Sequence, residues 1–236
     1  MRDRNVVLAL DVSGSMEGTP IDETKNASNN FVNTILKENA DIGIVTYDDS
    51  SEIATGLSND KYNLQNIISS LGTGGDTNIE AGLRDAAWML EKTGGKKKII
   101  VLMSDGEPNN GLQGDDLIEY ADSIKKEGIR IYTIGFFDSL SDKSSAQYLM
   151  EHIASDGCHY EASGADQLVF FFEDMADQIN GQKYIYVRIA CPVDVSVRYN
   201  GEELNSMEKN LNTRTSFGTL TFEDSREHSG DMSRTV

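Results

Sequence analysis

The sequence predicts an α/β fold, in which a three-layer, doubly wound and mostly parallel β-sheet is covered by helices on both faces. Apolar runs of strand length recur along the first three quarters of the chain, and segments with helical spacing separate them. Strands that alternate with helices need crossover connections, which make the strands parallel and place helices on both faces. After about residue 180 the pattern changes to strict alternation, which indicates a small C-terminal β appendage.

Four apolar runs are expected to form the parallel strands. A fifth strand, SEIATGL (51–57), follows the second run after the turn-like DDSS, so these two should form a hairpin and add one antiparallel strand. The four runs are VVLAL (6–10), IGIVTY (42–47), KIIVLM (98–103) and IRIYTIGFF (129–137).

Between these runs, apolar residues recur three and four positions apart, as they do on one face of a helix. Trp88 lies on one of the expected helices, beside Ala87 and Leu90, and we expect it in the core. The helical sets are Phe31, Val32, Ile35 and Leu36; Ile79, Leu83, Ala87 and Leu90; Leu117, Tyr120, Ala121 and Ile124; residues 144–154; and residues near 165–179.

The organisation predicted is a main domain over 1–182 and a β appendage over 183–236. In the appendage, YIYVRIACPVDVSVRYNGEEL alternates with period two and contains Asn200-Gly201, a strong hairpin-turn signal. TSFGTLTFED is another strand-like piece. Two or three strands with few core residues do not fold alone, so we expect an incomplete appendage that packs on the main domain, with a frayed tail.

Composition excludes several partners. The 236 residues include 39 Asp and Glu against 21 Lys and Arg, a formal charge of −18, which argues against binding to nucleic acid or an anionic membrane. No apolar stretch approaches the roughly 18 residues of a membrane span. The opening MRDRNVVLAL is too short in its apolar part for a signal peptide and is expected to be the first strand.

The two cysteines, Cys158 and Cys191, form no CxxC pair and no metal-type cluster, so a zinc site is not expected. Two alternatives stay open for them. They are separate thiols, or, in an exported protein, a disulfide that ties the appendage to the main domain.

Oxygen-bearing side chains gather in three loops that should meet at one edge of the sheet. The loops are DVSGS (11–15), GTGGDTN (72–78) and SDGEPNN (104–110), and ligands of open α/β sheets bind at the carboxyl ends of the strands. Hard divalent cations prefer oxygen ligands. The candidate metal ligands are two carboxylates, Asp11 and Asp105, and three hydroxyls, Ser13, Ser15 and Thr77.

These motifs resemble those of the von Willebrand factor A-type domain. DVSGSM matches the DxSxS signature of that family, and GGDTNIEAGL and LMSDGEPN resemble its threonine and aspartate segments. The resemblance covers about residues 5–180 and implies a Rossmann-like fold with a metal-ion-dependent adhesion site. It implies that Ser13, Ser15 and Thr77 are hydroxyl ligands, and that Asp11 and Asp105 act directly or through bound water.

The function that this resemblance implies is non-enzymatic. A bound Mg²⁺, with Mn²⁺ or Ca²⁺ as other possibilities, would capture an Asp or Glu that a partner protein presents, as in cell adhesion. Because the chain is so acidic, we expect that anchor on a neutral or basic surface. An extracellular or cell-surface location is favoured over a cytoplasmic one, and the residues indicate no particular oligomeric state.

Two other functions stay open. The first is a Mg²⁺-dependent phosphatase similar to the haloacid-dehalogenase type, with Asp11 as nucleophile. That type usually carries a second Asp two residues later, where this chain has Ser13. GTGGDT also lacks the lysine of a P-loop. The second is an intracellular, chaperone-linked scaffold of the same family. No residue in the sequence distinguishes such a scaffold from an adhesion module.

Overall fold

The structure, a computed structural model, describes residues 4–38, 40–94, 96–137 and 143–161, and shorter pieces of the remainder. The chain divides into two compact units, Met1–Lys183 and Tyr184–Val236. The pieces beyond 161 are residues 171, 175, 179, 196–199, 202–205, 223–224 and 234–235.

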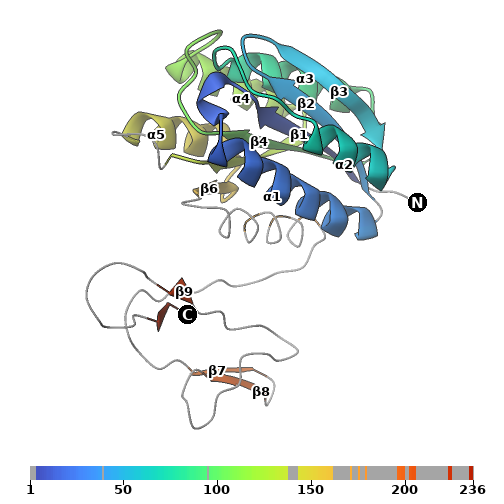
Figure 1. The fold of residues 1–236 in the computed structure, drawn as a ribbon, viewed down its shortest axis with the longest axis vertical. Coiled ribbons are helices and arrows are strands. Elements are labelled where there is room, and N and C mark those ends of the chain that lie inside the picture. The colour runs from blue at the N-terminus through green and yellow to red at the C-terminus, as the bar shows by residue number, and fades with distance from the viewer. Residues whose placement is uncertain are drawn as a thin grey trace. The chain divides into compact units, whose positions relative to one another are not determined.

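The first unit contains a six-stranded sheet in the order β3-β2-β1-β4-β5-β6 (Figure 1). All neighbouring strands are parallel except β2 and β3, which pair antiparallel. The fold class predicted from the sequence is therefore confirmed, including the antiparallel strand. The strands are β1 (Arg4–Asp11), β2 (Ala40–Tyr47), β3 (Ser51–Ser58), β4 (Lys97–Ser104), β5 (Ile129–Gly135) and β6 (His159–Glu161).

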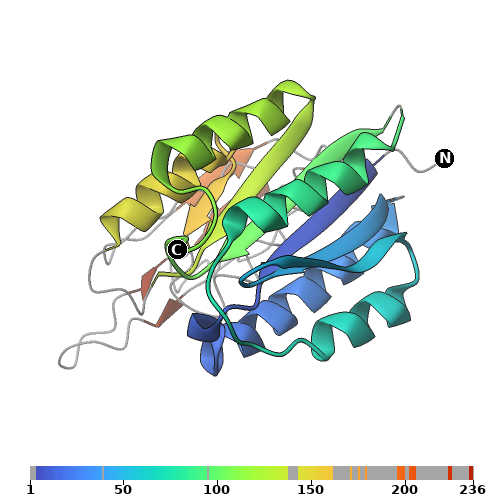
Figure 2. The ribbon, with the colours of Figure 1, turned by 90° about the horizontal axis from the view of Figure 1, so that it is seen from above.

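Two hydrophobic layers hold the helices on the sheet, and β1 contributes to both. Its side chains alternate between faces: Val6 and Leu8 pack with α1 and α2, whereas Val7 and Ala9 pack with α3, α4 and α5. Figure 2 shows these two helical layers on opposite faces of the sheet. The helices are α1 (Thr19–Ile35), α2 (Lys61–Ser69), α3 (Ile79–Glu91), α4 (Gly114–Lys126) and α5 (Ser144–Ile153), with short 3-10 turns at Gly14–Met16 and Leu36–Glu38.

Two details of the helices differ from the sequence predictions. Helix α2 was not predicted; Asp60 caps it by accepting a hydrogen bond from the amide of Asn63, and Leu64 and Ile68 are its buried residues. The prediction that Trp88 lies in the core is wrong. Its side chain is 48% exposed, and the ammonium of Lys92 lies 3.5 Å from its ring centroid, a cation–π contact at the surface.

The helix predicted near 165–179 falls mostly outside the described residues. Phe171, Met175 and Ile179 are described, are helical, and belong to the same hydrophobic layer as α1 and α2. None of the described helices combines the length and the apolar character needed to cross a bilayer.

In the second unit, β7 (Ser196–Tyr199) and β8 (Glu202–Asn205) pair antiparallel on either side of Asn200-Gly201, as the sequence predicts for a hairpin. The two-residue strands β9 (Glu223–Asp224) and β10 (Arg234–Thr235) also pair antiparallel. The rest of the predicted strand TSFGTLTFED, and most of the tail expected to fray, lie outside the described residues.

Candidate metal site

The candidate ligands lie where the order of the strands reverses. From β1 the chain forms β2 and β3 on one side, and then returns to form β4 on the other side of β1. β1 ends at Asp11 and its parallel neighbour β4 ends at Ser104, next to Asp105. Side chains that leave both strand ends therefore enter the same space, the usual ligand position in an open α/β sheet.

Asp11 is fully buried, and both of its carboxylate oxygens accept hydrogen bonds. The amide of Ser13 donates to Oδ1 at 2.9 Å, and the hydroxyl of Ser104 donates to Oδ2 at 2.7 Å. Burial raises the pKa of Asp11 to about 6, an effect that the hydrogen bonds oppose and the nearby carboxylate of Asp105 reinforces. A buried carboxylate in this state favours a compensating positive charge.

Ser13, Ser15 and Asp105 form a continuous polar chain beside it. The hydroxyls of Ser13 and Ser15 lie 3.1 Å apart, and Ser15 donates to Oδ1 of Asp105 at 2.8 Å. Ser13 and Asp105 are buried, whereas Ser15 is exposed. The structure thus brings four of the five predicted residues together in one cluster that opens to solvent at Ser15.

Thr77 belongs to the second loop, which backbone hydrogen bonds fasten to the first. The amide of Gly74 donates to the carbonyl of Val12 at 2.9 Å, and that of Gly14 donates to the carbonyl of Gly75 at 3.0 Å. A Cβ at residue 14 would lie 3.3 Å from that same carbonyl oxygen, so glycine permits the close approach of the two loops.

The third loop fixes the backbone at Thr77. The side-chain oxygen of Asn109 accepts from the amide of Thr77 at 2.8 Å, and the amide of Asn109 donates back to the carbonyl of Thr77 at 3.1 Å. Helix α3 is capped by Asn78, whose side chain accepts from the amide of Ala81. The cap is therefore not Thr77, although a lone threonine before a helix is typical of one.

The donor set fits a hard cation. Oδ2 of Asp105 is buried and accepts no hydrogen bond from the described residues, so an acceptor is available inside the cluster. Burial also raises the pKa of Asp105, while the hydrogen bond from Ser15 opposes this. No three His, Cys, Asp or Glu side chains of the described segments form a metal-holding group. An ion bound here would therefore draw on the serine and threonine hydroxyls as well.

Two residues that support this cluster were not among the sequence-predicted ones. Ser104 bonds Asp11 across the two strands, and Asn109 positions Thr77. Both lie inside SDGEPNN, the third loop of the motif. Because Ser104 is the last residue of β4, directly before Asp105, its place near the site could be predicted from the sequence, but its bond to Asp11 could not.

Cys158 lies directly before β6 and is a buried, free thiol. Its Sγ lies 3.1 Å from Nε of Arg130, which donates to it. Both alternatives for the cysteines stay open. Cys191 lies outside the described residues.

Comparisons with known proteins point to one family. The model of the von Willebrand factor type A domain matches residues 5–182. Inter-alpha-trypsin inhibitor heavy chain H3 of Mesocricetus auratus is 27% identical over 196 residues, which cover 75% of this chain and 21% of that protein. The chain thus spans about a fifth of the length of this relative.

Solved structures share the fold at low identity. The vWF domain of the type V pili tip protein Mfa5 from Porphyromonas gingivalis superposes with a TM-score of 0.69 at 18% identity, covering 78% of this chain and 98% of that one. The pilus adhesin SpaC from Lactobacillus rhamnosus GG superposes with a TM-score of 0.66 at 16% identity, covering 86% of this chain and 36% of that one.

Proposed function

The chain belongs to the von Willebrand factor type A domain family, and we propose that it is a divalent-metal-dependent protein-binding module that captures a carboxylate of a partner protein. The main support for the proposal is the polar cluster at the place where the order of the strands reverses. There Asp11, Ser13, Ser15 and Asp105 are linked by hydrogen bonds, and one buried oxygen of Asp105 accepts none from the described residues.

The residues that would hold the ion, directly or through water, are Asp11, Ser13, Ser15, Thr77 and Asp105. We propose Mg²⁺, with Mn²⁺ or Ca²⁺ as substitutes, because all five residues offer oxygen and none offers sulfur or imidazole nitrogen. When bound, the cation supplies an open coordination position for an external Asp or Glu.

The protein's own residues set the charge and the access of this site. If the three neutral hydroxyls contact the ion and the carboxylates act through bound water, a divalent ion keeps much of its positive charge, which favours an acidic ligand from outside. Ser104 holds Asp11 in place from the neighbouring strand, and the exposed Ser15 marks the side from which a partner can approach.

The geometry does not favour the phosphatase alternative. A nucleophilic Asp11 must reach a phosphorus atom directly, but its side chain is fully buried, and Ser13 stands where that enzyme type usually carries its second Asp. We therefore propose a binding role without catalysis.

An extracellular or cell-surface location is the one we propose. Two of the proteins with this fold are a pilus tip protein and a pilus adhesin by name. The acidic surface, with a formal charge of −18, also matches a module that binds a neutral or basic partner.

The proposal is tested with Thr77→Ala, which removes one candidate ligand while leaving both carboxylates. The probes are two immobilised peptides that carry one Glu or one Gln in a glycine–serine background, with Mg²⁺ or with EDTA. Wild type should retain the Glu peptide only with Mg²⁺, and Thr77→Ala should lose most of that capture. Its fold should survive, because one hydroxyl contributes about 1 kcal/mol.

A parallel assay with an aryl phosphate separates binding from catalysis. Turnover that requires both Mg²⁺ and Asp11, and that Asp11→Asn abolishes, would overturn the proposal. Capture that EDTA abolishes, without turnover, supports it. Glu107→Gln, an exposed acid on the third loop, is the matched control and should bind as wild type does.

A further inference from the structure

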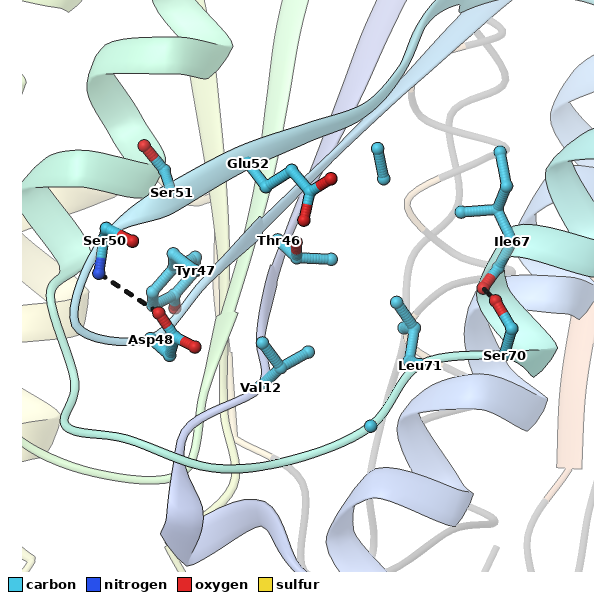
Figure 3. Close-up of a pocket in the computed structure, with 12 residues that line it drawn as sticks. Val12, Thr46, Tyr47, Asp48, Ser50, Ser51, Glu52, Ile67, Ser70 and Leu71 are labelled. Atoms are coloured by element: carbon cyan, nitrogen blue, oxygen red, sulfur yellow. Dashed lines mark hydrogen bonds between the residues drawn. The ribbon is translucent and has the colours of Figure 1, made fainter.

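A pocket of about 450 Å³ lies beside the candidate metal site, between the β2–β3 hairpin and the segment around the end of α2. In Figure 3 the side chain of Glu52 points into it from β3, and those of Ile67 and Leu71 face it from the α2 side. Its lining includes Val12, Asp48, Glu52, Ile67 and Leu71.

The pocket and the metal site share backbone. Val12, which lines the pocket, lies between Asp11 and Ser13 in the chain. Its amide donates to the carbonyl of Tyr47 at 2.9 Å, and its carbonyl accepts from Gly74. A ligand side chain in the pocket would therefore lie next to a ligand carboxylate at the metal site.

The chemistry of the two walls differs. Asp48 and Glu52 provide carboxylates on the hairpin side, and none of the described residues that line the pocket is a lysine, arginine or histidine. None of the ion pairs between described residues involves either acid. Opposite them, Ile67 and Leu71 provide apolar surface that is partly buried against the core.

An acidic wall facing an apolar wall suits a long basic side chain. Lysine and arginine cover apolar surface with their methylene stems while the charged end stays in a polar environment. The volume leaves ample room for one such side chain, since it falls within the range of pockets that hold whole small molecules.

We propose that this pocket receives a lysine or arginine side chain of the same partner whose carboxylate reaches the metal. The inference rests on the proposed function and adds a specificity determinant to it. Glu52 is the principal acid, because its side chain is exposed within the pocket, whereas Asp48 already accepts a hydrogen bond from the amide of Ser50 at 3.1 Å. The partner surface would then carry an acid and a base side by side.

The pocket alone is tested without metal, by amide NMR spectra of the full chain in EDTA. The probes are Nα-acetyl-lysine amide and Nα-acetyl-norleucine amide, which share a stem and differ in the ammonium group. At concentrations on the order of 10 mM, the lysine probe should shift the amides of Val12, Glu52 and Leu71 more than the norleucine probe. Glu52→Gln should weaken lysine binding by about threefold, as expected for an exposed ion pair.

Glu107→Gln, which removes the same charge outside the pocket, should leave lysine binding unchanged. Equal shifts with both probes, shifts confined to other parts of the chain, or equal lysine binding by Glu52→Gln and wild type would each overturn the inference. Adding Mg²⁺ in excess over the EDTA tests the proposed function separately, through the amides of Ser13 and Asp105. If Mg²⁺ shifts these amides but the lysine probe shifts none, only the pocket proposal is overturned. If the lysine probe causes shifts but Mg²⁺ causes none, the proposed function is overturned.

Joint use of the two sites is tested with peptides in which one Glu is separated from a Lys, or from a norleucine, by one to four residues. With Mg²⁺, at least one Lys peptide should bind about threefold more tightly than its norleucine partner. Glu52→Gln should abolish that preference while retaining Mg²⁺-dependent binding. Identical affinities for every Lys and norleucine pair in wild type would contradict the inference.

Discussion

At the scale of single residues, Asp11 determines the electrostatics of the candidate site. It is fully buried at the end of the central strand, and burial raises its pKa to about 6. Without a cation, the ionised carboxylate therefore destabilises the folded state at neutral pH. A binding site that places a buried charge where an external ion will bind lowers the stability of the ion-free protein.

Asp11→Asn should stabilise the metal-free protein and abolish its metal binding. The side-chain oxygen of an asparagine can still accept the hydrogen bond from the amide of Ser13. Its amide group can donate to the hydroxyl of Ser104, because that hydroxyl can donate instead to the carbonyl of Gly106, which lies 3.2 Å away. At pH 7 in EDTA, denaturant unfolding should show a gain of about 2–3 kcal/mol. Glu107→Gln should change little.

The sign of the pH dependence follows from the same shift. Because the pKa of Asp11 is higher in the folded protein than its ordinary value of 3.8, the folded state binds the proton more tightly. The stability of the metal-free protein should therefore fall as pH rises from about 4 to about 6, and Asp11→Asn should flatten that slope. A variant in EDTA no more stable than wild type at pH 7 would contradict this account.

The sequence predicted which candidate ligands would lie together, but not the residues that support them. Asp11, Ser13, Ser15 and Asp105 follow buried strands, so their meeting follows from topology alone. Ser104 and Asn109 could not be assigned, because their roles depend on which side-chain oxygen reaches which partner across β1, β4 and the loops. Such contacts arise from the packed structure and leave no periodic signal in the chain.

At the scale of elements, strong periodicity predicted five of the six strands of the first unit's sheet and four of its helices, whereas α2 was missed. That helix has only nine residues and two fully buried ones, Leu64 and Ile68, too few for a clear helical pattern. Trp88 was placed in the core because its neighbours are apolar. On α3, however, its position turns it outward, next to Lys92.

Helix α3 supports the site through Gly82, which packs on the ring of Tyr47. A Cβ at residue 82 would lie 2.5 Å from Cδ1 of that buried ring. The carbonyl of Tyr47 accepts a hydrogen bond from the amide of Val12, and its hydroxyl donates one to the carbonyl of Met103. It therefore ties β2 to the ends of both strands that carry the site.

Gly82→Ala should destabilise the protein, although alanine is the better helix former. Overpacking against a buried ring costs about 1–3 kcal/mol, which exceeds or offsets the gain of about 1 kcal/mol in helix propensity. Urea unfolding in EDTA measures the difference. Gly56→Ala is the control, because a Cβ there meets nothing within 4 Å. A stabilised Gly82→Ala variant would show that the ring contact does not constrain α3.

At the scale of the whole molecule, the acidic charge should oppose folding. With 39 acidic against 21 basic residues, the compact chain repels itself, and monovalent salt should screen that repulsion. Raising NaCl from about 0.02 to about 0.5 M, a range over which the screening length falls severalfold, should raise the thermal midpoint in EDTA. A midpoint that falls over this range would contradict the prediction.

The five oxygen-bearing residues where the strand order reverses are proposed to form one divalent-metal site. Calorimetric titration of Mg²⁺ into the chelator-stripped full chain tests it most directly, with Asp11→Ala and Glu107→Gln beside wild type. We expect a single site in wild type and in Glu107→Gln, and a severe loss of affinity in Asp11→Ala. Wild-type protein that binds no Mg²⁺, Mn²⁺ or Ca²⁺ at about 10 mM, or an Asp11→Ala variant that binds as wild type does, would contradict it.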